Sequence, residues 1–163
     1  MKTNLSAQAI LAEVISETDA KWEKSRHLYP FGAAGFQVAF SPVSTGGLVC
    51  IGMNPGGTEK DFDRVAAATY PKSHDWFEWD YPLARKMRDS FRSIAAEKQL
   101  EASTCLNLRF FRSQSMREWQ TADRSVRRDL ETFSVVRVRS YSRRWLRKPF
   151  WRSEWTPTTG SAL

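Results

Sequence analysis

The stretch Leu48-Val49-Cys50-Ile51-Gly52-Met53-Asn54-Pro55-Gly56-Gly57 decides how this sequence is interpreted. Its first half is apolar without alternation, which predicts a buried strand over residues 47–52. Its second half is a turn, because Gly supplies backbone angles that other residues avoid and Pro55 fixes its own φ. An α/β protein places reactive groups at the carboxyl ends of parallel strands. Asn54, the polar side chain of this turn, is therefore the first candidate for a functional residue.

A second buried strand is predicted over 103–108, and residues 36–40 are expected to form a short strand. Helices are predicted over 6–24, with Ser6 as the cap, and over 82–98. Another helix is expected from a cap at Thr121 or Asp123. The order strand, helix, strand, helix predicts an α/β fold with a central, mainly parallel sheet and right-handed crossovers.

Apolar spacing predicts which faces of these helices are buried. The helix over 82–98 is expected to bury Leu83, Met87, Phe91, Ile94 and Ala95. The helix that follows Asp123 is expected to bury Val126, Leu130 and Phe133.

Length and composition favour one folded domain. The 163 residues are enough for a core, and 41% of them are apolar. No apolar run approaches the roughly 18–20 residues of a membrane span, and residues 1–12 lack the pattern of a signal peptide. We therefore expect a cytoplasmic protein with no membrane partner. Cys50 and Cys105 lie in apolar runs, which predicts buried reduced thiols, with a disulfide or catalytic pair as the alternative.

The positive charge is concentrated near the C-terminus. The net charge is +7, and residues 135–163 contribute +6 of it. After Ser134 the pattern changes: Val135 to Arg139 is compatible with the start of a strand, and the remainder is rich in Arg, Ser and Trp. We therefore expect a domain over 1–134 and a basic, aromatic, atypical tail over 135–163, for which a shifted reading frame or a fusion is one hypothesis. Such a tail can also stack on single-stranded nucleic acid.

Two familiar phosphate-binding motifs do not fit the Asn54 turn. No Gly-Lys-Ser/Thr follows the glycines, and Pro55 stands where the helix of a dinucleotide fingerprint begins. An ordinary strand-to-loop turn remains the structural alternative. Asn107 interrupts the second buried strand, and a buried amide needs partners. Those partners are either neighbouring backbone groups or a ligand such as uracil, whose carbonyl and N–H edge complements an amide.

The pair Gly52-Met53-Asn54-Pro55-Gly56 and Cys105-Leu106-Asn107-Leu108 resembles the uracil-DNA glycosylase superfamily. The first motif is similar to the water-positioning motif of the mismatch-specific and single-strand-selective branches. The second is similar to the strand whose Asn reads the uracil edge, and Phe110-Phe111-Arg112-Ser113 resembles less-studied bacterial members. The resemblance covers about residues 47–133 and implies a three-layer α/β/α fold, incomplete at the C-terminus.

The resemblance also implies roles for the site residues. Asn54 would hold the attacking water, within a substrate-binding turn made with Gly52, Met53, Pro55 and Gly56. Asn107 would bind the flipped base and stabilise charge on it as it leaves.

Other roles are expected around this pair. Tyr70 is the candidate for stacking on the base, and Arg109 and Arg112 are placed to meet DNA phosphates. No metal or other cofactor is expected. The family's second motif, typically His-Pro-Ser, is absent, since the only histidines are His27 and His74.

The leading function is therefore hydrolysis of the N-glycosidic bond to uracil or a related damaged pyrimidine in DNA, by a monomer. The alternatives are a catalytically inactive nucleic-acid-binding relative and a truncated fragment of a glycosylase.

Overall fold

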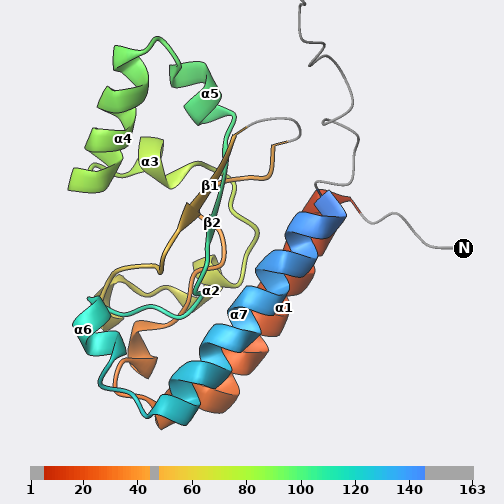
Figure 1. Ribbon diagram of the computed structural model, residues 1–163, viewed down its shortest axis with the longest axis vertical. Helices are drawn as coiled ribbons and strands as arrows, with labels where there is room; N and C mark the ends of the chain where they lie inside the picture. The colour runs from red at the N-terminus through yellow and green to blue at the C-terminus, as the bar shows by residue number, and fades with distance from the viewer. Residues whose placement is uncertain (1–5, 45–47, 146–163) are drawn as a thin grey trace, which may run out of the picture.

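A computed structural model describes residues 6–44 and 48–145 of the chain (Figure 1). It combines helices with a small parallel sheet, so the fold is broadly α/β. The two strands are β1 (Val49–Gly52) and β2 (Thr104–Asn107). The α-helices are α1 (Ala7–Ser25), α2 (Arg64–Ala67), α3 (Asp75–Glu78), α4 (Pro82–Ser93), α5 (Glu97–Glu101), α6 (Met116–Trp119) and α7 (Arg124–Trp145). Short 3-10 helices cover Arg26–Leu28, Gly32–Ala34 and Glu59–Asp61.

Strands β1 and β2 pair in parallel, as predicted, from Val49 opposite Thr104 to Gly52 opposite Asn107. The other edge of β2 contacts residues 36–40, which form isolated antiparallel bridges at Phe36 and Ala39 rather than the expected strand. Their backbone still bonds β2, since Phe40 N donates to Cys105 O at 3.0 Å. Within the described residues, β2 therefore lies between β1 and this segment.

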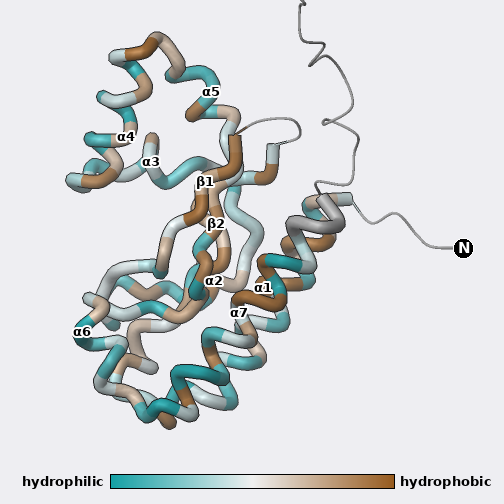
Figure 2. Tube along the Cα trace, viewed as in Figure 1, coloured by the Kyte–Doolittle hydropathy of each residue, from teal (hydrophilic) through white to brown (hydrophobic). Residues whose placement is uncertain are grey.

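Strand β1 is less buried than its sequence predicts. It is hydrophobic along its trace (Figure 2), yet Ile51 is 55% exposed. Strand β2, in contrast, is buried at all four positions. The difference follows from position, because β2 has neighbours on both edges and β1 pairs on one edge only within the described residues.

Helices α1 and α7 lie side by side and antiparallel (Figure 1). Helix α1 begins as predicted, with the Ser6 side chain accepting a hydrogen bond from Ala9 N at 3.2 Å. Two ion pairs link the helices, Lys21 with Asp129 at 2.5 Å and Arg137 with Glu17 at 2.6 Å, within the described residues. Their apolar faces form the main core with residues of the 36–40 segment and β2, including Leu11, Val14, Phe36, Leu106, Leu130 and Tyr141.

Helix α7 corrects the expectation of a strand start at residues 135–139. Asp123, one of the two predicted caps, accepts from Ser125 N at 2.7 Å, and the helix then continues to Trp145. Leu130 is fully buried as predicted, and Val126 and Phe133 pack partly buried against the same core. The expected boundary between residues 134 and 135 falls inside this helix, and residues 146–163 of the tail lie outside the described residues.

The helix predicted over 82–98 is interrupted. Helix α4 ends at Ser93, Ala95 adopts a positive φ of 55°, and α5 starts at Glu97. The predicted buried face is wrong at Leu83 and Ile94, which are 56% and 70% exposed, and at Ala95, which is also exposed. Met87 and Phe91 are half-buried against a second, smaller cluster, formed by Phe40, Trp76, Ala84, Leu100 and Cys105.

The continuity of α7 can be tested with a matched pair of substitutions. Val138→Ala removes methyl groups from the core, whereas Val136 lies two residues earlier in the same helix and is 55% exposed. Both changes share the same gain in helix propensity. We expect Val138→Ala to lower the free energy of unfolding by about 2 kcal/mol more than Val136→Ala, measured by urea denaturation. Equal effects would contradict the packing of α7 beyond residue 134.

Candidate functional site

The carboxyl ends of β1 and β2 remain joined beyond the strands themselves. Leu108 N donates to Gly52 O at 2.7 Å, and Arg109 N donates to Met53 O at 3.0 Å. Further along, Ser113 N donates to Pro55 O at 3.3 Å. The Asn54 turn is therefore held against residues 108–113 by backbone hydrogen bonds, and both predicted Asn residues lie at this edge of the sheet.

The Asn54 side chain is half-buried and anchored through its nitrogen. Nδ2 donates to Ser113 Oγ at 3.1 Å and to Pro55 O at 3.3 Å. Ser113 is buried, and its hydroxyl in turn donates to Ser115 O at 3.2 Å. Because Nδ2 is used in this way, the carbonyl oxygen of Asn54 is the acceptor that the turn presents. Ser113 is not among the residues that the sequence predicts for this site, since only the fold brings it to Asn54.

Around Asn54 the turn alternates in exposure. Met53 is 57% exposed, Pro55 is buried and Gly56 is exposed.

Asn107 is only 3% exposed and lies directly across from Gly52. Its Nδ2 donates to Gln37 O at 3.1 Å, so part of its hydrogen-bonding capacity is met by neighbouring backbone. A Cβ atom built on Gly52 would lie 2.8 Å from Asn107 Oδ1. Position 52 is therefore glycine for a steric reason, because the Asn107 carboxamide occupies the space above its Cα.

Two further polar residues extend this network. Gln37 Nε2 donates to Asp75 Oδ2 at 2.8 Å, at the first residue of α3. Burial raises the pKa of Asp75, and the hydrogen bond from Gln37 opposes that rise. Neither Gln37 nor Asp75 is predicted from the sequence. The signal present there is that Gln37 stands between the apolar residues Phe36 and Val38.

Arg112 holds the loop that follows Asn54. Its Nε donates to Gly56 O at 2.8 Å and its Nη1 donates to Asp61 O at 3.0 Å. Burial lowers the pKa of this guanidinium, and the charges of Asp61 and Asp75 oppose the effect. The guanidinium passes so close to Gly57, which has a φ of +115°, that a Cβ there would lie 2.3 Å from Nη2. Arg112 thus has an internal structural role, and its assignment as a phosphate contact stays a prediction.

Arg109 is also engaged within the chain. Its Nη2 pairs with Glu131 at 2.9 Å, and its Nη1 lies 3.2 Å from Met116 Sδ. The guanidinium lies 5.4 Å from the centre of the Trp119 ring. This side chain is 19% exposed and paired with a carboxylate, so the predicted phosphate contact would compete with Glu131.

Tyr70 lies at the other end of the strands. Its hydroxyl accepts from Val43 N at 2.7 Å, and the next residue, Ser44, bonds the side chain of Thr104, where β2 begins. Asn107 is the last residue of β2. The Tyr70 hydroxyl is therefore anchored near the start of β2, and the stacking role predicted for this residue stays a prediction. Phe62 is the aromatic residue nearest in sequence to the Asn54 turn. Its ring packs on Trp22 and Phe36 in the core.

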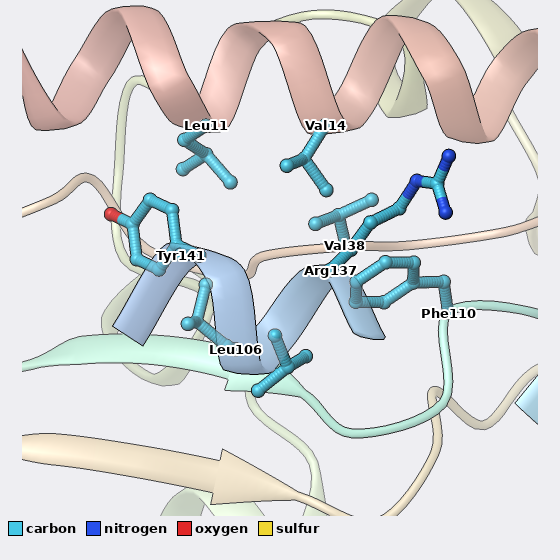
Figure 3. A pocket seen from close by; sticks show the side chains of 8 residues that line it. Leu11, Val14, Val38, Leu106, Phe110, Arg137 and Tyr141 are labelled. Carbon is cyan, nitrogen blue, oxygen red and sulfur yellow. The ribbon is translucent and has the colours of Figure 1, made fainter. Parts of the chain in front are cut away.

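A cavity of about 10 Å³ lies between α1 and α7 (Figure 3). Leu11, Val14, Val138 and Tyr141 line it with Phe110 of the main core. A water molecule needs roughly this volume and two or more polar partners. The cavity is therefore a small packing defect of the core and is separate from the Asn54 turn.

Comparisons with known proteins add no assignment: no protein-family model, curated protein or solved structure matches this chain. Residues 6–44 and 48–145 contain no helix that is both long and apolar enough to cross a membrane. The same described residues hold no group of three His, Cys, Asp or Glu side chains arranged for a metal ion.

The contact between Gly52 and Asn107 can be tested against a neighbouring glycine. Gly52→Ala forces the new methyl group onto Asn107 Oδ1, whereas a Cβ at Gly56 meets nothing within 4 Å. We expect Gly52→Ala to destabilise the protein by about 1–3 kcal/mol and Gly56→Ala to change the unfolding free energy by less than about 0.5 kcal/mol. Chemical denaturation of both variants measures the difference. The steric argument fails if the two substitutions have equal effects.

Proposed function

We propose that this chain is a DNA glycosylase that hydrolyses the N-glycosidic bond of uracil or a related damaged pyrimidine. One observation carries the proposal: β1 and β2 pair in parallel with Gly52 opposite Asn107. That register brings the two motifs that resemble the uracil-DNA glycosylase superfamily to one edge of the sheet. A base-excision site needs a water-holding group and a base-binding group side by side, and two adjacent parallel strand ends provide such positions.

In this proposal Asn54 orients the attacking water. Its nitrogen donates to Ser113 Oγ, which leaves the carbonyl oxygen as the acceptor for a water proton. The water then adds to C1′ of the sugar as the bond to the base breaks. A preorganised amide of this kind stabilises the oxocarbenium-like transition state because it needs no reorientation during the reaction.

Asn107 recognises the base in the same proposal. Its nitrogen carries two hydrogens, and Gln37 O accepts one of them. The remaining hydrogen and Oδ1 are the donor and acceptor that match a pyrimidine carbonyl and N–H. The hydrogen bond between Gln37 and Asp75 would then act indirectly, by fixing the segment that orients Asn107.

The proposal also covers the fold, the oligomeric state and the location of the protein. We propose a three-layer α/β/α arrangement, which the resemblance implies. We also propose that the protein acts on DNA as a monomer in the cytoplasm. Since Arg109 and Arg112 have internal partners, the DNA phosphates would be met by other basic residues. Arg117 and Arg124 are exposed and lie on α6 and α7.

The experiment is release of uracil from a single-stranded oligonucleotide by the purified full chain. We expect release by the wild type, a loss of about 10²–10³-fold in rate for Asn54→Ala, and retained release for Asn54→Asp, which keeps the acceptor oxygen. Gln99→Ala on α5, an exposed position far from the turn in sequence, is the control for unrelated effects.

Unchanged release by Asn54→Ala would overturn the role of Asn54. No release by a cooperatively folded wild type would contradict the glycosylase and favour the inactive nucleic-acid-binding relative. One observation favours that second candidate, the inactive relative. His74 contacts Ser103 just before β2 and so lies at the opposite end of the strand from Asn107. This histidine therefore does not replace the His of the family's second motif beside the two Asn residues.

A further inference from the structure

The two cysteines of the chain face each other across the sheet. Cys50 on β1 is opposite Cys105 on β2 in the parallel register. Paired residues of adjacent strands point to the same face, and neighbouring strands lie about 4.8 Å apart. Disulfides span Cα separations of about 4.4–6.8 Å, so the backbone spacing already suits a cross-link. Both thiols are free.

Their surroundings differ in access. Cys105 has no exposed surface and is packed with Trp76, Ala84 and Leu100 in the smaller cluster. Cys50 is half-buried at the border of the same cluster, on the strand that pairs on one edge only within the described residues. An oxidant can therefore reach Cys50 before Cys105.

The proximity of the two thiols also separates their reactivity. The neighbouring Cys105 thiol lowers the pKa of Cys50 to about 7, although partial burial opposes the shift. The interaction with Cys50, together with burial, raises the pKa of Cys105. Since the thiolate is the reactive form, Cys50 is the thiol that reacts first with an oxidant. Cys105 is then the resolving thiol, which attacks the oxidised Cys50.

A histidine and a serine complete the cluster on the side of Cys105. His74 Nε2 lies 3.4 Å from Cys105 Sγ, and Ser103 Oγ lies 3.3 Å from the same sulfur. Burial lowers the pKa of His74, which favours the neutral imidazole. His74 is therefore placed to take the proton of Cys105 when that thiol reacts.

We propose that Cys50 and Cys105 form a peroxide-responsive dithiol, in which Cys50 is oxidised first and Cys105 closes an intrachain disulfide between β1 and β2. In the first step the Cys50 thiolate attacks one oxygen of hydrogen peroxide. The O–O bond breaks, Cys50 becomes a sulfenic acid, and hydroxide leaves and is protonated to water. The sulfur loses two electrons and the peroxide gains them.

In the second step Cys105 Sγ attacks the sulfenic sulfur. The S–S bond forms and the S–O bond breaks, so hydroxide leaves. The proton that His74 takes from Cys105 balances this hydroxide, and water is the product. Overall, two thiols and one hydrogen peroxide give one disulfide and two waters. The cross-link would fix the spacing of β1 and β2, whose carboxyl ends position Asn54 and Asn107. The dithiol chemistry does not depend on the proposed glycosylase activity.

The test starts with the reduced full chain. Native protein is treated with hydrogen peroxide, quenched with catalase, unfolded in the presence of N-ethylmaleimide and weighed by intact mass spectrometry. We expect a monomer lighter by two hydrogen atoms and without maleimide. In untreated native protein we expect maleimide to label Cys50 at least about tenfold faster than Cys105. Retention of both thiols after peroxide, or a disulfide-linked dimer as the main product, would overturn the proposal.

Two variants separate the roles of the thiols. Cys105→Ser should stop the reaction at the Cys50 sulfenic acid, which dimedone traps as a stable adduct. Cys50→Ser should leave Cys105 reduced, so that it reacts with maleimide only after unfolding. Oxidation of Cys105 in Cys50→Ser at the wild-type rate would contradict the order of the two steps. Thermal melting followed by circular dichroism establishes that each variant is folded, and Cys105→Ala replaces Cys105→Ser if the hydroxyl is not tolerated in the buried cluster.

Discussion

The parallel pairing of β1 with β2 sets Gly52 against Asn107 and Cys50 against Cys105 in a single ladder. The backbone pairing then continues past the strands, so the Asn54 turn stays in contact with the chain as far as Ser113. A shift by one residue would reverse the face of every side chain in one strand. Both the polar pair and the thiol pair therefore depend on the same short set of backbone hydrogen bonds.

The buried amide of Asn107 explains why the neighbouring segment is arranged as it is. Leaving a buried polar group without a partner costs about 1–3 kcal/mol. The carbonyl of Gln37 meets this requirement, and the Gln37 side chain continues to Asp75 on α3. The apolar side chains of the segment over 36–40 pack in the core, while the polar groups of Gln37 hold the end of β2. This segment therefore contributes both to the core and to the candidate site.

Local patterns predict the elements whose stability is local. Helix α1 follows from its apolar stripe and the Ser6 cap, and β1 and β2 follow from short apolar runs. Residues 135–139 mislead, because Val-rich sequence favours a strand. Tertiary packing overrides that preference, since α7 places Leu130, Ser134, Val138 and Tyr141 on one buried stripe. Their spacing of four, four and three residues is a helical signal that is present in the sequence but outweighed by the local composition.

The candidate site shows the same division between local and distant information. Asn54 and Asn107 can be found from the sequence because each is a polar residue in an apolar context. Asn54 follows an apolar run, and Asn107 interrupts one. The partners of Arg109 and Arg112 cannot, because Glu131 and the Asp61 carbonyl come from distant segments. A basic residue after a strand is free to contact a phosphate only if groups inside the chain do not already bind it. Here a carboxylate pairs with Arg109 and backbone carbonyls accept hydrogen bonds from Arg112, so the proposed function rests on the geometry of two amides rather than on charge.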